Sequence, residues 1–505
     1  MTDHPQAYSQ LCNHAREVAL LSSAASLLGW DERTKMPAAG GAYRAEQMSY
    51  LAGLIHRRQT APEIGEWLKQ LAGSPFAEDC YSETGADIAH MQRDYDRKTK
   101  LPQALVEELA KLAVLGQQVW AEARRTNDFA KFRPILERTI VLKREEATAI
   151  GYKESPYDAL LDEFEPLETT ANVARVLKSL REQLVPLVAE IAGSKRRPSL
   201  EILNRRFPID RQEAFGRRVA EAIGFDFAAG RLDVTDHPFC CEAGPRDIRL
   251  TTRYDEHCLP GALFSTMHEA GHGMYEQGLP PERYGLPTGQ ATSLGIHESQ
   301  SRMWENLVGR SRAFWEHFLP AARSTFADAL SDVTLEDFYF AINDSRPSLI
   351  RTESDEVTYN LHILIRFELE QALLLDELRV ADLPGAWNDK YREYLGITPP
   401  NDSQGVLQDV HWSGGAFGYF PTYTLGNLYA AQFFEQAEKD LGALGEQFRR
   451  GEFRSLLDWL RTNIHQHGRR YSAAELVQRV TGKPLSHDAL MRHLRGKFGP
   501  LYDLN

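Results

Sequence analysis

The stretch TMHEAGHGMYEQG, residues 266–278, carries two histidines four positions apart, with a glutamate directly after the first. On an α-helix, residues i and i+4 project from the same face, so His268 and His272 can share one metal ion. Glu269 lies one position round the helix, where it can reach water at the metal without competing as a ligand. The spacing therefore predicts a helix that carries a metal site of the HExxH type.

A catalytic zinc ion takes three protein ligands and keeps one position open. Downstream, the stretch SLGIHESQSRMWENLVGR, residues 293–310, begins with a serine that can cap a helix, and Glu298, Arg302 and Glu305 follow at helical spacing. A loop of this length can return a second helix to the first. Spacing alone leaves the third ligand open among four glutamates: Glu276, Glu282, Glu298 and Glu305.

The segment RDIRLTTRY, residues 246–254, alternates polar and apolar residues, which is typical of a β-strand and places Asp247, Arg249 and Thr251 on one face. The region just before it, residues 230–247, is loop-rich. Elsewhere apolar residues recur at three- and four-residue spacing, which predicts helices over residues 105–123, 173–193 and 359–378. We therefore expect a mainly α protein with a small sheet beside the metal motif.

The composition and net charge of the chain disfavour some classes of binding partner. The 505 residues carry a formal net charge of -13, from 58 basic and 71 acidic residues, which disfavours nucleic acid and anionic membranes. Five cysteines, two of them adjacent, do not form a disulfide framework, and no apolar stretch is long enough to span a bilayer. We expect a cytoplasmic protein with an N-terminal helical cover over residues 1–100 and a catalytic helical region over residues 101–505.

Six segments, taken together and in order, resemble one known family. They are GWDERTKMPAAGGAYR (29–44), DIRLT (247–251), HEAGH (268–272), GIHESQSRMWEN (295–306), IRTESDE (350–356) and GVLQDVHW (405–412). The sequence resembles the carboxypeptidase Taq family of zinc metallocarboxypeptidases, and the resemblance covers essentially the whole chain.

The resemblance implies a helical fold with a deep groove, similar to neurolysin and angiotensin-converting enzyme, and a homodimer. It implies an enzyme that removes single amino acids from free peptide C-termini with broad specificity. It also implies zinc (Zn²⁺) as the metal, with cobalt (Co²⁺) often able to substitute, and Glu298 as the third ligand.

Several catalytic roles follow from the motif and the resemblance. Glu269 is expected to take the proton of the attacking water and to deliver it to the leaving amine. The oxyanion of the tetrahedral intermediate needs hydrogen-bond donors. Relatives with this fold place a histidine and a tyrosine there, so we expect His411 and Tyr423, with Tyr419 as the rival tyrosine. His297 and Asp409 are expected to support the metal ligands.

A carboxypeptidase must also bind a free carboxylate, and a guanidinium suits this because it can bind both oxygens. The candidates are Arg249, Arg253 and Arg351, and the resemblance favours Arg351. Gln408 and Tyr419 are expected to help in substrate binding. Asp247 and Arg249 are expected to form a pair that closes one end of the groove.

Two other functions remain as alternatives at this point. An oligopeptidase with the same metal centre would cut peptides internally, and it would accept an amidated peptide. A helical binding protein with a vestigial metal site would respond to a chelator in stability but would show no activity.

Overall fold

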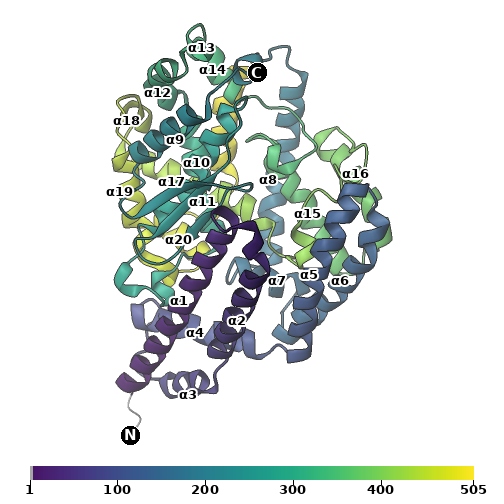
Figure 1. Ribbon diagram of the computed structural model, residues 1–505, viewed down its shortest axis with the longest axis vertical. Coiled ribbons are helices and arrows are strands. Elements are labelled where there is room, and N and C mark those ends of the chain that lie inside the picture. The colour runs from purple at the N-terminus through teal and green to yellow at the C-terminus, as the bar shows by residue number, and fades with distance from the viewer. Residues whose placement is uncertain (1–3, 505) are drawn as a thin grey trace. The chain divides into compact units, whose positions relative to one another are not determined.

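The computed structural model describes residues 4–504, which form helices and one small sheet (Figure 1). The chain makes two compact units, each built from segments that lie far apart in sequence. Unit 1 contains the residues up to Thr99, Pro198–Ile342 and Ala430–Pro484, and unit 2 contains Lys100–Arg197, Asn343–Tyr429 and the residues from Leu485 onward. The predicted mainly α fold with a small sheet is confirmed.

Unit 1 begins with four helices, three of which share a small core formed by Ala7, Leu11, Ile64, Leu68, Leu71 and Ile88. One boundary between the two units falls at residue 100, where the sequence predicted the end of an N-terminal helical cover. The helices before this boundary nevertheless belong to the same unit as the metal motif. The two-part division of the chain therefore stays a prediction. These helices are α1 (His4–Thr34), α2 (Gly41–Gln59), α3 (Pro62–Leu71) and α4 (Glu83–Thr99).

The middle of unit 1 carries the sheet and the two helices of the metal motif. Its elements are α9 (Ile209–Ile223), β1 (Gly230–Val234), β2 (Cys240–Glu242), β3 (Ile248–Thr252), α10 (Leu259–Glu276), α11 (Leu294–Arg302), the π-helical turn η5 (Met303–Gly309), α12 (Arg312–Thr325), α13 (Ala327–Leu330) and α14 (Leu335–Ile342). The last segment adds α18 (Leu444–Arg449), α19 (Arg454–Asn463), η9 (His465–Arg470) and α20 (Ala473–Thr481).

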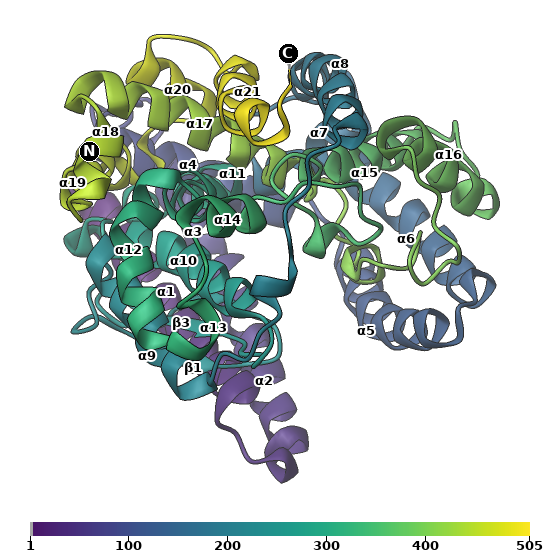
Figure 2. The same cartoon turned by 90° about the horizontal axis from the view of Figure 1, so that it is seen from above.

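Unit 2 is helical, and its helices α5 and α6 run side by side (Figure 2). Its elements are α5 (Gln103–Thr126), α6 (Phe129–Ile150), α7 (Pro156–Phe164), α8 (Thr170–Gly193), η6 (Arg351–Glu353), α15 (Tyr359–Leu374), α16 (Leu383–Leu395), η8 (His411–Gly414) and α21 (Asp488–Tyr502). Helix α17 (Pro421–Leu441) begins in unit 2 and ends in unit 1. No helix within residues 4–504 combines the length and the apolarity that a membrane crossing needs.

The predicted strand is the central strand of the sheet. Strand β3 pairs in parallel with β1 and antiparallel with β2, with Leu250 opposite both Leu232 and Cys240. Ile248 and Leu250 are buried, and Leu250 packs against helix α10 at Gly273. The two outer strands lie in the region that was predicted to be loop-rich. The sequence did not indicate them because each is short and is stabilised by pairing with β3 rather than by a pattern of its own.

The three predicted helices exist as α5, α8 and α15. Helix α15 ends at Leu374, before the predicted residue 378. The chain turns there because Asp376 adopts a left-handed conformation, with φ of 63°. A residue in that region of backbone space cannot continue a right-handed helix.

Candidate active site

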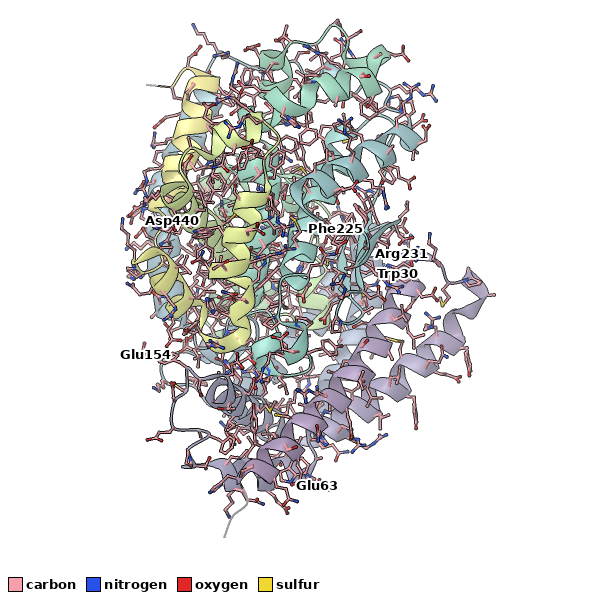
Figure 3. All side chains as sticks on the ribbon, turned by 90° about the vertical axis from the view of Figure 1, so that its left-hand side faces the viewer. Trp30, Glu63, Glu154, Phe225, Arg231 and Asp440 are labelled. Carbon is pink, nitrogen blue, oxygen red and sulfur yellow. The ribbon has the colours of Figure 1, made fainter. Side chains whose placement is uncertain are left out.

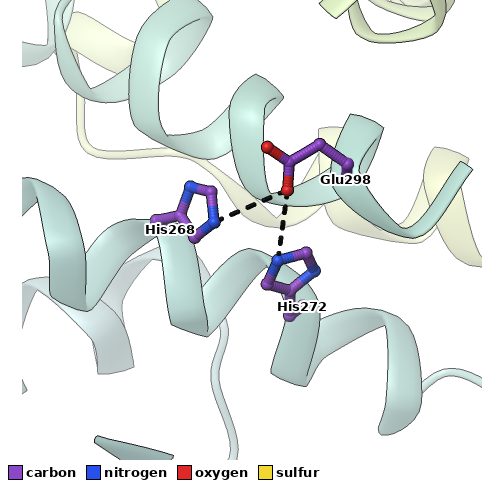
Figure 4. A group of neighbouring side chains, drawn as sticks. All are labelled: His268, His272 and Glu298. Carbon is purple, nitrogen blue, oxygen red and sulfur yellow. Dashed lines mark ion pairs between the residues drawn. The ribbon is translucent and has the colours of Figure 1, made fainter. Parts of the chain in front are cut away.

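Helix α10 presents both histidines of the HEAGH motif on one face, and α11 brings a carboxylate to them (Figure 4). Oε2 of Glu298 lies 3.6 Å from Nε2 of His268 and 3.4 Å from Nε2 of His272. One donor atom from each residue lies within 4.8 Å of the others, and no other metal-binding group of this kind occurs among residues 4–504. The structure thus brings these three predicted ligands together.

A close approach of two helices creates this arrangement. A Cβ atom at Gly271 would stand 2.6 Å from both the carbonyl oxygen of Gln300 and the Cα of Ser301. Such distances are far below contact distance, so only glycine allows α10 and α11 to approach this closely. The glycine inside HEAGH therefore sets the position of Glu298 relative to the histidines.

Glu305 holds the ring of His268 in place from the π-helical turn η5. Its Oε2 lies 2.9 Å from Nδ1 of His268, which donates the hydrogen bond and leaves Nε2 free to bind a metal. Arg302 supports both carboxylates, with Nε at 2.8 Å from Oε1 of Glu298 and Nη1 at 3.1 Å from Oε2 of Glu305. Glu305, which the sequence named only as a rival ligand, thus lies where it can orient His268.

The protonation states of Glu298 and His272 suit metal binding. Burial opposes ionisation of Glu298, but Arg302 and the two histidines outweigh it and hold the pKa of this carboxyl well below its usual range. Burial lowers the pKa of His272 to about 3, so its ring is neutral near pH 7. An ionised carboxylate and a neutral imidazole are the forms that bind metals.

Glu269 lies beside the ligands as a buried carboxyl. Burial raises its pKa to about 7, against the opposing influence of His268. A carboxyl with a pKa near neutrality can both accept and release a proton. The geometry of α10 thus gives Glu269 the properties of a general base next to the metal ligands.

His297 contacts the metal ligands through packing. Its ring stacks on that of His272, with centroids 4.4 Å apart and planes inclined by 22°, and its Nε2 lies 2.7 Å from Oε1 of Glu276. Glu276 is therefore engaged by His297, and Glu282 is exposed. Neither of these two rivals belongs to the His268–His272–Glu298 group.

The donor set fits zinc or cobalt. Two imidazole nitrogens and one carboxylate oxygen are the ligands of many catalytic zinc sites, and they leave a coordination position open. Cobalt accepts the same donors.

A second group of predicted residues lies within unit 2. Asp409 pairs with Arg351, its Oδ1 lying 2.8 Å from Nη2, and with Arg366, its Oδ2 lying 2.7 Å from Nη2. Burial opposes ionisation of Asp409, but the two guanidinium groups hold its pKa well below the usual range. Gln408 accepts a hydrogen bond from the backbone N–H of Arg351 at 2.9 Å. We call Arg351, Arg366 and Asp409 the arginine cluster.

His411 and Tyr423 lie beside the arginine cluster in the same unit. Nε2 of His411 is 3.3 Å from the hydroxyl of Tyr423, and Arg351 lies 5.0 Å over the Tyr423 ring. Burial lowers the pKa of His411 to about 4. The ring of Tyr419 lies 5.4 Å from the rings of both His411 and Tyr423, so the rival tyrosine belongs to the same aromatic group.

Asp247 and Arg249 form a close pair at the start of β3. Both Asp247 oxygens lie 2.8 Å from nitrogens of Arg249, and this guanidinium lies 4.4 Å over the ring of Trp30. Arg231 lies 4.9 Å over the same ring. Figure 3 labels Arg231 and Trp30 close to each other. Arg253, the third arginine considered, is exposed.

Two residues that shape these two groups were not predicted from the sequence. Gly271 had no predicted role, and Arg366 had none beyond its place in the predicted helix over residues 359–378. A signal for Arg366 was present, because it is an arginine inside the apolar run LHILIRF, residues 361–367. A charged residue in a helix that is buried all round needs a partner, so it points to a specific contact.

Comparison with known proteins decides the family. A family model described as Carboxypeptidase Taq (M32) metallopeptidase matches residues 10–498. The chain belongs to the carboxypeptidase Taq family. The thermostable carboxypeptidase 1 of Thermus thermophilus is 48% identical to it, over 98% of this chain and 99% of the relative. Carboxypeptidase 1 of Bacillus subtilis is 38% identical, over 96% and 97%.

Solved structures agree with this assignment. The crystal structure of the carboxypeptidase from Deinococcus radiodurans has a TM-score of 0.95 at 41% identity and covers 99% of this chain and 100% of its own. Metallocarboxypeptidase 1 of Trypanosoma cruzi has a TM-score of 0.93 at 34% identity, over 98% and 99%. This member of the carboxypeptidase Taq family is a metal-dependent carboxypeptidase, and the family favours that activity over both alternatives raised by the sequence.

Proposed function

We propose that the protein removes amino acids one at a time, with broad specificity, from the free C-termini of peptides, with zinc or cobalt held by His268, His272 and Glu298. The observation that carries the proposal is the group of three donor atoms within 4.8 Å on α10 and α11, with Glu269 beside it. A zinc or cobalt ion held there supplies Lewis acidity, which activates water as a nucleophile.

Glu269 acts as the general base and then as the general acid. Its buried carboxylate takes a proton from the attacking water and later delivers it to the leaving amine. Burial raises the pKa of this carboxyl above its usual range, which makes it a stronger proton acceptor than an exposed glutamate.

His411 and Tyr423 stabilise the oxyanion of the tetrahedral intermediate. Their polar atoms lie 3.3 Å apart, at hydrogen-bond distance from each other, so an oxyanion that displaces this contact can accept from both. The low pKa of His411 leaves its ring neutral, with one N–H to donate. Donors that are fixed before the reaction stabilise developing charge effectively. Tyr419 is kept as the alternative donor and as a substrate contact.

Arg351 binds the terminal carboxylate of the peptide, and Gln408 holds the backbone of Arg351. The side chain of Arg351 is 6% exposed, so its charge is only weakly screened by water. Asp247 and Arg249, a rigid pair against Trp30, block one end of the substrate groove that the family resemblance implies.

The assembly is a cytoplasmic homodimer. Helix α2 has no buried residue and presents Tyr43 and Tyr50 with about two thirds of their surface exposed (68% and 69%), so it is a suitable surface for a second copy. All five cysteines are unpaired, which fits a reducing compartment. Light scattering on the wild type and on the Tyr43→Glu variant tests the dimer, because an unchanged mass in the variant would exclude this surface.

Two peptides that are identical except for a free or an amidated C-terminus test the activity. Each is incubated with the metal-loaded protein and the products are followed by mass spectrometry, with a chelated sample as control. We expect stepwise loss of C-terminal residues that is much faster from the free peptide than from the amidated one, and only with metal. Internal cuts in both peptides would contradict the proposal.

A further inference from the structure

The arginine cluster holds one carboxylate between two guanidinium groups. Oδ1 of Asp409 lies 2.9 Å from Nε and 2.8 Å from Nη2 of Arg351. Oδ2 lies 2.8 Å from Nε and 2.7 Å from Nη2 of Arg366. The Arg366 side chain is 0% exposed, so it reaches neither bulk water nor a substrate.

These three residues carry one excess positive charge. Two guanidinium groups contribute two positive charges, and Asp409 contributes one negative charge. Burial lowers the pKa of the neighbouring His362 and His411, so neither ring adds charge near pH 7. Within the described part of the chain, no other carboxylate is hydrogen-bonded to either arginine.

The remaining partners of the two guanidinium groups are neutral. The Tyr359 hydroxyl accepts from Arg351 at 3.0 Å, and Arg366 donates to Gln408 at 2.8 Å and to the carbonyl oxygen of His362 at 2.7 Å. A buried charge without a counter-charge is costly, and an anion that enters the site relieves that cost.

We infer that Arg366 is a positioning residue for recognition of the substrate carboxylate. It binds the second oxygen of Asp409, so this carboxylate does not fully neutralise Arg351. With Asp409 alone, Arg351 would belong to a neutral ion pair and would attract an anion weakly. The inference rests on the proposed function, in which Arg351 binds the peptide carboxylate.

Arg366 also fixes the geometry of Arg351 through Gln408. The Oε1 atom of Gln408 accepts from Nη2 of Arg366 and from the backbone N–H of Arg351. The guanidinium of Arg366 lies 4.4 Å over the ring of Trp387, which holds it in one plane. Arg366 therefore sets both the unneutralised charge and the position of Arg351, although it does not itself touch the substrate.

Variants that change the net charge of the arginine cluster separate its charge from its geometry. Arg366→Gln makes the cluster neutral, Asp409→Asn raises its charge by one, and the double variant returns it to one excess positive charge. For each we measure kcat and KM on the free and the amidated peptide, with circular dichroism as a check of folding. The key quantity is the preference for the free peptide, expressed as the ratio of the two kcat/KM values.

We expect Arg366→Gln to lower this preference at least about tenfold, mainly through a higher KM for the free peptide. The double variant recovers most of the preference because its net charge matches the wild type. A double variant no better than the single one would overturn the inference, because a purely structural role predicts additive damage. Arg181→Gln, which removes a partly buried arginine paired with Glu368 in the same unit, is the control and leaves the preference unchanged.

Two further outcomes keep this inference distinct from the proposed function. If Arg351→Gln leaves the preference intact, Arg351 does not bind the substrate carboxylate and the proposed role fails. If Arg351→Gln erases the preference while Arg366→Gln does not, only the present inference fails. Should Arg366→Gln not fold, Arg366→Lys keeps the charge; a retained preference supports the inference, and a loss equal to that of Arg351→Gln overturns it.

Discussion

The metal centre and the arginine cluster differ in how the chain encodes them. The metal centre uses two neighbouring helices, and His268, His272, Glu298 and Glu305 lie within one short stretch of sequence. The arginine cluster joins residue 351 in η6, residue 366 in α15 and residue 409 ahead of η8. Helical spacing places the two histidines of the metal centre directly, whereas the cluster exists only after three separate segments pack together.

The two sites also differ in charge. The metal centre combines the ionised carboxylate of Glu298 with the neutral ring of His272 around a point that suits a cation. The arginine cluster keeps a buried positive charge that suits an anion. In the proposed function the first site performs the chemistry and the second recognises the end of the peptide. The variants below test whether these two roles are separate.

The largest effect is expected from Glu269→Gln, which removes the proposed general base and leaves the His268–His272–Glu298 group in place. We expect kcat to fall about 10³-fold, within the range for loss of general base catalysis, with little change in metal content. Steady-state kinetics together with metal analysis measures both quantities. Full activity with bound metal would show that another group takes the proton.

Glu305→Gln tests how the metal centre is held, separately from the arginine cluster. It weakens the carboxylate that orients the His268 ring, so we expect metal affinity to fall about 10- to 100-fold. Competition with a chelator measures this affinity. The matched control is Glu282→Gln at an exposed position, which leaves the affinity unchanged; equal losses in the two variants would mean that Glu305 has no orienting role.

Gly271→Ala tests the close approach of α10 and α11. The added Cβ would collide with the backbone at Gln300 and Ser301, so we expect a loss of about 1–3 kcal/mol in the free energy of unfolding. Gly385→Ala in α16 is the control, because nothing lies within 4 Å of its added Cβ and alanine favours helix. Urea unfolding of both variants measures the difference, and an equally stable Gly271→Ala would refute the steric argument.

The smallest effect concerns His465, which donates to Gln300 and whose pKa is lowered by burial to about 3. The unfolded chain protonates this imidazole below about pH 6.5 and the folded protein does not, so stability falls as pH falls. We expect the wild type to lose about 1 kcal/mol more per pH unit below 6.5 than His465→Gln. Urea unfolding between about pH 7 and pH 5 measures this, and parallel curves would contradict the assignment.

Local patterns predicted much of the structure. The HEAGH spacing predicted α10 and the shared face of its two histidines, and alternation predicted β3, because both depend on neighbours in sequence. Glu298 was one of four glutamates by spacing, and only the family resemblance singled it out. The choice depends on the approach of α11 at Gly271, which is a tertiary contact.

Other features could not be predicted because they depend on distant partners. Strands β1 and β2 are defined by pairing with β3, and α15 ends early at a left-handed residue. The contact of Arg366 with Asp409 joins residues 43 positions apart. A pattern in sequence can show that a buried arginine needs a partner, but it cannot name the partner.

The separation of roles is tested most directly by measuring kcat/KM on the free and the amidated peptide for the wild type, Glu269→Gln and Arg351→Gln in one experiment. We predict that Glu269→Gln lowers turnover about 10³-fold while peptide binding persists. We predict that Arg351→Gln keeps measurable turnover and loses the preference for the free peptide. If Arg351→Gln still distinguishes the two peptides as the wild type does, the arginine cluster does not recognise the C-terminus and the account is wrong.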